Sequence, residues 1–186
     1  MIWESHFWKD DILKQAERLE KRKLQKRWPE TSFAKLEQTV MLGFYSVRKL
    51  HEAAKLSTAT MEKQLVLPAY SWTGKNVTKL NWHRLDELYD LENPNNVSKN
   101  ILFVCHQFVH SFLFTPCFDD ANNLDAILFA SDCQRHDALL RISIDQIIET
   151  FQTIGNDYPN SSTYTLNPKT GDYDVVSEMK TGPITM

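Results

Sequence analysis

Apolar positions along this chain follow helical spacing in some segments and strand-like alternation in others. Between Val97 and Phe114 (VSKNILFVCHQFVHSFLF), apolar side chains fill one continuous half of a helix at 100° per residue. No other segment is apolar enough to form the middle of a core. Asn96 can cap the start of such a helix, and Pro116 prevents its continuation. We therefore predict a central buried helix here.

Two longer amphipathic helices are predicted before this segment. The first runs from about Trp3 to Trp28 and is ended by Pro29. The second covers roughly Ser32 to Leu56 and carries a broad apolar stripe. Gly43 in its middle weakens the helix by about 1 kcal/mol relative to alanine, which suggests that another backbone approaches there.

Two further helices have recognisable ends. Asn81 to Leu91 (NWHRLDELYDL) has Trp82 at an inward position and is predicted as a short helix. Ser143 and Gln146 have the spacing of a capping box, and Gly155 stops the isoleucine-rich helix that follows. The sequence therefore predicts a last helix of about twelve residues.

Strand-like composition marks several shorter runs. They cover residues 64–72, 124–130, 138–143, 163–166 and 172–176. Pro68 restricts the first run to a sheet edge or a bulge, because proline cannot donate to a ladder. We expect an α+β fold, in which the first, second and central helices pack on a small, mostly antiparallel sheet that includes residues 124–143.

The length of 186 residues is that of a single domain, which can bury about 70% of the surface that its unfolded chain exposes. We predict one domain over residues 1–186. Its compact core covers about residues 1–155, and residues 156–186 form a peripheral hairpin and a tail. The last ten residues are expected to be mobile.

Charge gives no overall attraction to nucleic acid or to an anionic membrane, since 21 basic and 24 acidic residues leave a net charge of −3. We expect neither as a partner. One local exception is a cluster of six basic side chains within ten positions: Arg18, Lys21, Arg22, Lys23, Lys26 and Arg27. It is either a phosphate-binding surface or a solvated face near a helix C-terminus, and we favour the second interpretation.

Targeting and cofactor signals are few. The first residues, MIWESHFWKDD, lack the basic lead and apolar run of a signal peptide. Cys105, Cys117 and Cys133 show no paired spacing, which is typical of reduced thiols, and we expect a cytoplasmic location. The glycines form no phosphate-binding pattern, so no cofactor is expected.

His106 and His110 lie four residues apart, at a separation where two imidazoles can share a metal or act as acid and base. Further thiol and imidazole ligands would be Cys117, Cys133 and His136. No local Cys-x-x-Cys pair fixes two ligands, and a proline separates Cys117 from the helix. We predict no metal site.

The runs NWHRLDELYDL and HQFVHS together resemble a group of short uncharacterised bacterial proteins, along much of the chain. No activity is assigned to that group. The resemblance therefore implies no functional residues and no fold, although it makes an ordinary housekeeping enzyme less expected.

The favoured function is a non-enzymatic accessory or binding protein that holds a small molecule or a partner chain. Its candidate site combines the polar-aromatic face of the central helix with two nearby rings: Phe103, His106, Gln107, His110, Trp82 and His83. A homodimer is expected, because five Trp, six Tyr and ten Phe residues exceed what one core hides. The alternative is a metal-assisted or histidine-dependent hydrolase that acts on a nucleic acid or phosphoester.

Overall fold

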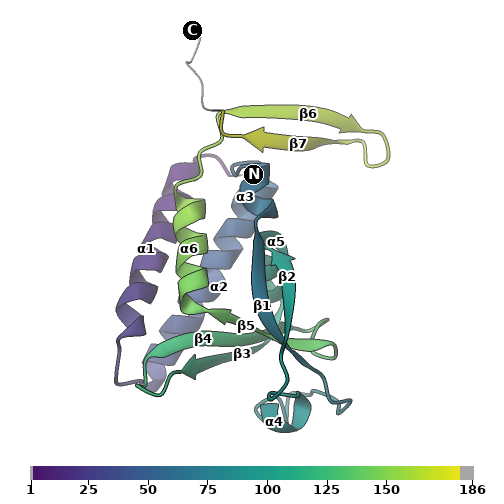
Figure 1. Cartoon of the computed structure of the whole chain (residues 1–186). Coiled ribbons are helices and arrows are strands. Elements are labelled where there is room, and N and C mark those ends of the chain that lie inside the picture. The colour runs from purple at the N-terminus through teal and green to yellow at the C-terminus, as the bar shows by residue number, and fades with distance from the viewer. Residues whose placement is uncertain (1, 181–186) are drawn as a thin grey trace.

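The computed structural model describes residues 2–180, and over this range the chain has an α+β fold (Figure 1). The helices are α1 (Ser5–Lys23), α2 (Glu30–Glu52), α3 (Thr58–Glu62), α4 (Leu85–Leu88), α5 (Ile101–Val109) and α6 (Ile144–Gly155). The strands are β1 (Gln64–Ser71), β2 (Asn95–Asn100), β3 (Ser111–Phe118), β4 (Leu124–Ser131), β5 (Ala138–Ser143), β6 (Ser161–Asn167) and β7 (Asp172–Glu178).

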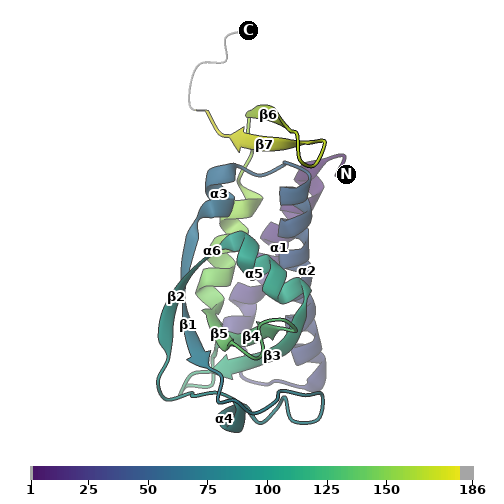
Figure 2. The same cartoon turned by 90° about the vertical axis from the view of Figure 1, so that its right-hand side faces the viewer.

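Five strands form one antiparallel sheet in the order β2-β1-β5-β4-β3. Strands β6 and β7 form a separate hairpin. The helices α1, α2 and α6 run side by side, and Figure 1 shows the hairpin at one end of them and α4 at the other. Helix α5 packs on α2 and β4 and runs obliquely across the helices in Figure 2.

Both faces of the sheet are covered, which explains why β4 is apolar without interruption from Ala126 to Ala130. Ile127 and Phe129 face the helices and belong to the main core. Leu128 and Ala130 face the other way and pack with a smaller cluster that includes Tyr89. Successive side chains of a strand point to opposite faces, so a strand covered on both sides is apolar at every position.

Stacked phenylalanines connect the helices to the sheet. The ring of Phe108 lies 4.6 Å from that of Phe44 and 4.5 Å from that of Phe129, and Phe151 meets Phe44 edge-on at 5.0 Å. A Cβ added at Gly43 would lie 2.2 Å from Cζ of Phe151. The close approach predicted at Gly43 is therefore present, but it is made by a phenylalanine ring and not by another backbone.

Several predicted elements are confirmed. The hairpin of β4 and β5, the strand β1, the helix α2 and the pairing of β6 with β7 lie where the pattern placed them. The capping box of α6 is also present: the Gln146 backbone N–H donates to Ser143 Oγ at 3.1 Å, and the Gln146 side chain accepts from the Ser143 N–H. The mostly antiparallel sheet is antiparallel in every pair of described strands.

The prediction of one buried helix over Val97–Phe114 is wrong. This segment contains the last four residues of the strand β2, the nine-residue helix α5 and the first half of the strand β3. Asn100, and not Asn96, is the N-cap, and its side chain accepts from Phe103 N at 2.8 Å. The flanking residues pair with β1 and β4, so ladder formation overrides the local helical pattern.

Two other predicted helices are too long. Helix α1 ends at Lys23, and Trp28 instead packs edge-on against Phe118 while its indole N–H donates to the Gln25 carbonyl. Within residues 81–91 only the single turn of α4 is helical. Trp82 is 41% exposed and does not point inward.

Strand β1 lies inside the sheet, although Pro68 predicts an edge or a bulge. The pairing with β5 begins only at Ala69, so the preceding residues of β1 have one unpaired side. The Val66 carbonyl on that side accepts from the Gln146 side chain at 3.0 Å. Pro68 lies two residues further and faces the same way, where no ladder donor is needed.

The predicted tail is described only in part. Ser177 and Glu178 belong to β7, so they are ordered in the hairpin. Residues 181–186, which make up most of the expected mobile tail, lie outside the described residues.

Candidate functional site

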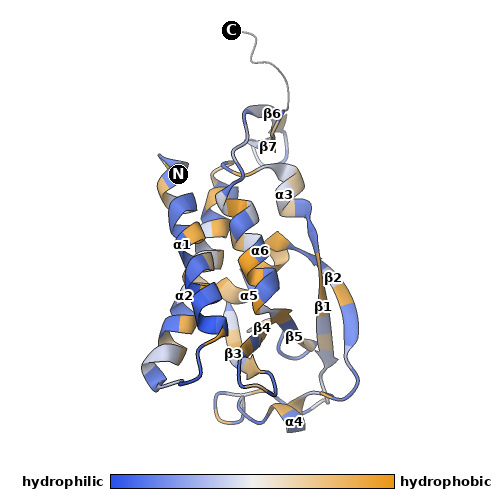
Figure 3. Cartoon of the chain, turned by 60° about the vertical axis from the view of Figure 1, so that its left-hand side comes forward, coloured by the Kyte–Doolittle hydropathy of each residue, from blue (hydrophilic) through white to orange (hydrophobic). Residues whose placement is uncertain are grey.

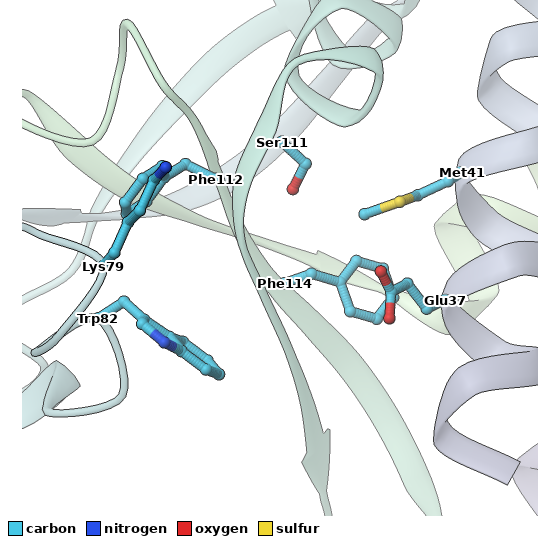
Figure 4. A pocket seen from close by; sticks show the side chains of 7 residues that line it. All are labelled: Glu37, Met41, Lys79, Trp82, Ser111, Phe112 and Phe114. Carbon is cyan, nitrogen blue, oxygen red and sulfur yellow. The ribbon is translucent and has the colours of Figure 1, made fainter. Parts of the chain in front are cut away.

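A cleft of about 320 Å³ lies along the exposed edge of the sheet at β3, and its volume is within the range of small-ligand sites. Figure 4 shows the side chains that surround it, which come from α2, β3 and the segment before α4. They are Glu37, Met41, Lys79, Trp82, Ser111, Phe112 and Phe114. The cleft therefore combines three aromatic rings with one carboxylate and one ammonium group.

Two walls of the cleft come from elements far apart in sequence. Glu37 and Met41 are four residues apart on α2, so they share one face of that helix. Trp82 and Lys79 come from the opposite side of β3, as Figure 4 shows. The strand edge between them carries Phe114, which points to the same side of β3 as Glu37 and Met41 in that view.

An irregularity in β3 sets the direction of Phe112. The pairing with β4 shifts register between Ser111 and Leu113, as at a β-bulge. The Ser111 hydroxyl donates to the Leu113 carbonyl at 2.9 Å across this irregularity, and the guanidinium carbon of Arg135 lies 4.0 Å from the centre of the Phe112 ring. Phe112 therefore lies on the side of β3 that faces Lys79 and Trp82, opposite to Phe114 (Figure 4).

The loop that carries Lys79 and Trp82 is held by its own side chains. The Asn81 carboxamide oxygen accepts from the Thr78 N–H at 2.7 Å, and the Asn81 amide donates to the Asn76 carbonyl at 2.9 Å. The Trp82 N–H donates to the Thr78 carbonyl at 3.1 Å. These bonds position the indole without burying it.

A polar cluster lies beside the cleft, at the end of α5. Arg48 Nη1 is 3.3 Å from His110 Nε2, and Arg48 Nε donates to the Glu52 carboxylate at 2.8 Å. His110 immediately precedes Ser111 of the cleft, and Arg48 lies two turns beyond Met41 on α2. Neither Arg48 nor Glu52 is identified by sequence pattern, because charges on a long amphipathic helix are ordinarily solvated.

Burial and positive charge favour the neutral form of two imidazoles in this region. The pKa of His106 is lowered by partial burial, and the nearby charges of Arg48 and His110 lower it further. Burial also lowers the pKa of His51, one turn from Arg48 on α2. A neutral imidazole can accept a proton, so these groups have the protonation state that a general base needs.

The predicted site residues do not form a single site. His106 and His110 are exposed near Arg48, and Trp82 lines the cleft. Gln107 is 5% exposed and its side-chain oxygen accepts from Ser131 N at 3.0 Å, so it holds α5 to the end of β4. Phe103 packs against the main core, with the Lys99 ammonium over its ring.

The remaining predicted residue, His83, is exposed and does not line the cleft; its ring lies edge-on to Trp82 at 5.9 Å. Its helix was expected to be continuous, and the single-turn α4 begins only after it.

The side chains considered as extra metal ligands are dispersed. His136 Nε2 accepts from the Val77 N–H at 3.1 Å, while Cys133 is exposed and Cys117 is partly buried in β3. Burial raises the pKa of the Cys117 thiol. Among residues 2–180, no group of three or more His, Cys, Asp or Glu side chains is arranged to hold a metal ion.

Sequence reasoning missed most of the cleft, although one signal was present. The run Phe112-Leu113-Phe114-Thr115-Pro116 alternates as a strand does, and a strand assignment would have placed its aromatic side chains beside β4. The contribution of α2 carries no such signal, because Glu37 and Met41 reach the cleft only through tertiary packing.

The chain matches no protein-family model, no curated protein and no solved structure. No helix within the described part of the chain is long and apolar enough to cross a membrane.

Proposed function

We propose that this protein is a non-enzymatic binding protein whose ligand site is the cleft at the edge of β3. The observation that carries the proposal is the convergence of Trp82, Phe112 and Phe114 on a cleft whose walls also hold Glu37 and Lys79. Aromatic walls with a few polar groups are typical of small-molecule sites. The ligand class that fits is a small planar molecule with an ionisable group.

Each feature of the cleft supports one property of such a ligand. Trp82 remains 41% exposed although indole rings are usually well covered, so its face is free for stacking. The Lys79 ammonium favours an anionic substituent, and the Glu37 carboxylate favours a cationic one or a hydrogen-bond donor. Orientation of the ligand would follow from this pair of opposite charges.

The aromatic dye anilinonaphthalene sulfonate tests the site, because it has flat aromatic rings that can stack and carries a single negative charge. We expect enhanced dye fluorescence with the folded protein and at least about a tenfold loss of affinity in Trp82→Ala, equivalent to about 1.4 kcal/mol. Lys79→Ala should weaken binding and Glu37→Gln should strengthen it, since these changes remove an attractive and a repulsive charge.

Trp3→Ala is the matched control, because Trp3 is 91% exposed and does not line the cleft. It should leave dye affinity at the wild-type value. Equal losses in the Trp3 and Trp82 variants, or no effect of either charge substitution, would place the dye elsewhere and contradict the proposed site.

A histidine-dependent hydrolase is the second candidate, and the Arg48–His110 contact favours it. An arginine next to an imidazole can bind a phosphate oxygen while a neighbouring neutral imidazole accepts a proton. Bis(p-nitrophenyl) phosphate is a suitable probe. If this candidate is correct, the wild type hydrolyses the probe and both Arg48→Ala and His110→Ala lose the activity. Trp82→Ala should retain it. Absence of turnover in the wild type would exclude this reaction with the probe.

We also propose that the predicted homodimer forms through the β6–β7 hairpin. The register places Tyr164, Leu166 and Tyr173 on one face, and each remains more than half exposed. Sedimentation at two concentrations should show a dimer that Tyr173→Ser weakens. Val176→Ser, on the opposite face, is the control, and a monomer at both concentrations would refute the assignment.

A further inference from the structure

A groove of about 410 Å³ lies between α1 and α2, and it shares no lining residue with the sheet-edge cleft. Its α1 wall carries Gln15, Arg18 and Arg22, which are three and four residues apart and share one helix face. The residues that line the groove are Gln15, Arg18, Arg22, Lys35, Gln38, Thr39 and Leu42.

This groove is positively charged, and no acidic side chain lines it. Arg18, Arg22 and Lys35 form no ion pair within residues 2–180. The two guanidinium groups instead donate to neutral carboxamide oxygens, of Gln15 at 3.1 Å and Gln25 at 3.0 Å. Because a guanidinium has five N–H donors, each arginine retains donors for a ligand.

The structure also distinguishes two pairs of residues within the basic cluster at the end of α1. Lys23 is paired with Asp145 of α6, and Lys26 donates to the Ala121 carbonyl at 2.7 Å. These two lysines therefore connect the end of α1 and the segment after it to α6 and to the loop before β4. Arg18 and Arg22 make no such tertiary contact, so a purely structural role does not account for them. Figure 3 shows the hydrophilic C-terminal half of α1 that carries them.

Towards the N-terminus of α1 the groove continues into a smaller hollow lined by Phe7, Trp8, Asp11 and Ser46. Asp11 lies one turn before Gln15, and Ser46 lies one turn after Leu42, so both walls are continuous. The Phe7 ring is 65% exposed there. Asp11 is the acidic group of this hollow, and it is paired with Lys14 at 3.1 Å.

We propose that the α1/α2 groove binds consecutive phosphate groups of a chain-like anion, either an inorganic polyphosphate or the backbone of a single-stranded nucleic acid. The planar donors of Arg18 and Arg22 match phosphate oxygens, and Lys35 adds a third positive charge from the opposite wall. Gln38 supplies a neutral hydrogen-bonding group, whereas the buried Thr39 hydroxyl already donates to the Lys35 carbonyl at 2.7 Å. Phe7 lies where a base of a bound strand would stack.

Binding of two probes tests the proposal: tripolyphosphate, followed by calorimetry, and a labelled single-stranded oligonucleotide of about ten nucleotides, followed by anisotropy at about 50 mM salt. The variant Arg18→Ala/Arg22→Ala should lose at least about tenfold in affinity for a probe that binds. It should also reduce the slope of log affinity against log salt for the oligonucleotide by about 0.7 for each phosphate contact that is lost.

Lys21→Ala/Arg27→Ala is the matched control, since it removes two exposed positive charges from the same region without touching the groove lining. It should lose less than about twofold in affinity, because exposed charges outside the site are screened by salt. An equal loss in the two double variants would overturn the proposal, and so would a wild-type protein that binds neither probe.

Phe7→Ala distinguishes the two sources of phosphate. Oligonucleotide affinity that falls severalfold in this variant, with tripolyphosphate affinity unchanged, would identify a single-stranded nucleic acid as the ligand. Binding of tripolyphosphate but not of the oligonucleotide, unchanged by Phe7→Ala and lost in the double arginine variant, would identify the polyphosphate.

Discussion

Two polar clusters lie near the C-terminal end of α2, and they differ in burial. In the first, the Asp157 carboxylate is 2% exposed and accepts from the Ser57 N–H at 2.7 Å and from the Ser57 hydroxyl at 2.6 Å. The backbone carbonyl of Asp157 accepts from the Lys9 ammonium, which is also buried. In the second cluster, Arg48, His106 and His110 remain accessible to solvent.

The difference in burial separates a structural role from a binding role. The Asp157 cluster joins the end of α6 to α1 and to the turn before α3, and its groups are satisfied by one another. The Arg48 cluster joins only α2 and the end of α5, and its side chains keep hydrogen-bonding groups available for a ligand. Hydrogen-bonded polar groups in the interior maintain the fold, whereas accessible ones beside a cleft are candidates for function.

Removal of the buried carboxylate should have the largest effect. In Asp157→Ala, the Ser57 donors lose their partner and the buried Lys9 charge loses its nearest carboxylate. We expect a decrease of about 3–5 kcal/mol in the free energy of unfolding, measured with urea. His110→Ala in the exposed cluster should change it by less than about 0.5 kcal/mol, and similar losses in the two variants would contradict the distinction.

A smaller effect is expected from overpacking the buried face of α2, the helix that bears Arg48 on its exposed face. Gly43→Ala improves helix propensity by about 1 kcal/mol, but the new Cβ would lie 2.2 Å from Cζ of the buried Phe151 ring. We expect a net loss of about 1–2 kcal/mol in thermal or urea unfolding. In the Phe151→Leu background the alanine should be tolerated better, and an unchanged penalty there would show that the ring is not the cause.

A third comparison concerns the N-caps of α5 and α6, because these two helices lead to the two clusters. Asn100→Ala and Ser143→Ala each remove a side-chain acceptor from an early backbone N–H, at 2.8 Å and 3.1 Å. Each should cost about 1 kcal/mol of unfolding free energy. Because α5 carries His106, Asn100→Ala should also weaken the binding or hydrolytic activity of the exposed cluster, while Ser143→Ala should not.

These two helices also show how much of the fold could be predicted from the sequence. Helix α6 was predicted because Ser143, Gln146 and Gly155 mark both of its ends locally. Helix α5 was predicted to be too long at both ends, because Val97 and Phe112 fit an apolar helical stripe as well as they fit strands. Short apolar runs have this ambiguity, and only pairing with β1 and β4 resolves it.

The candidate site was less predictable than the fold, for a related reason. Trp82, His106 and His110 could be proposed because rings and imidazoles are chemically distinctive. Asp157 and Glu37 could not be assigned, because one carboxylate becomes buried and the other reaches a cleft only when distant elements pack together. A sequence indicates which groups are available, whereas tertiary packing decides which of them meet.

The smallest expected effect is a pH dependence that belongs to the exposed cluster. The pKa values of His51 and His106 are lowered in the folded chain, mainly by burial. In the unfolded chain the histidine pKa is about 6.5, so just below this pH the unfolded chain binds more protons than the folded chain does. The free energy of unfolding therefore falls as the pH drops below that value, towards the lowered pKa values. Because solvent screens both groups, we expect this loss to be below about 1 kcal/mol.

Urea unfolding at neutral and mildly acidic pH measures this loss. His51→Gln/His106→Gln should lose less stability on acidification than the wild type does. Arg48→Gln should give an intermediate result, because the Arg48 charge lowers the pKa of His106, whereas the pKa of His51 is lowered by burial and by His106. A double histidine variant that loses as much stability as the wild type would show that the imidazoles are not perturbed, and it would remove the support for a neutral base beside Arg48.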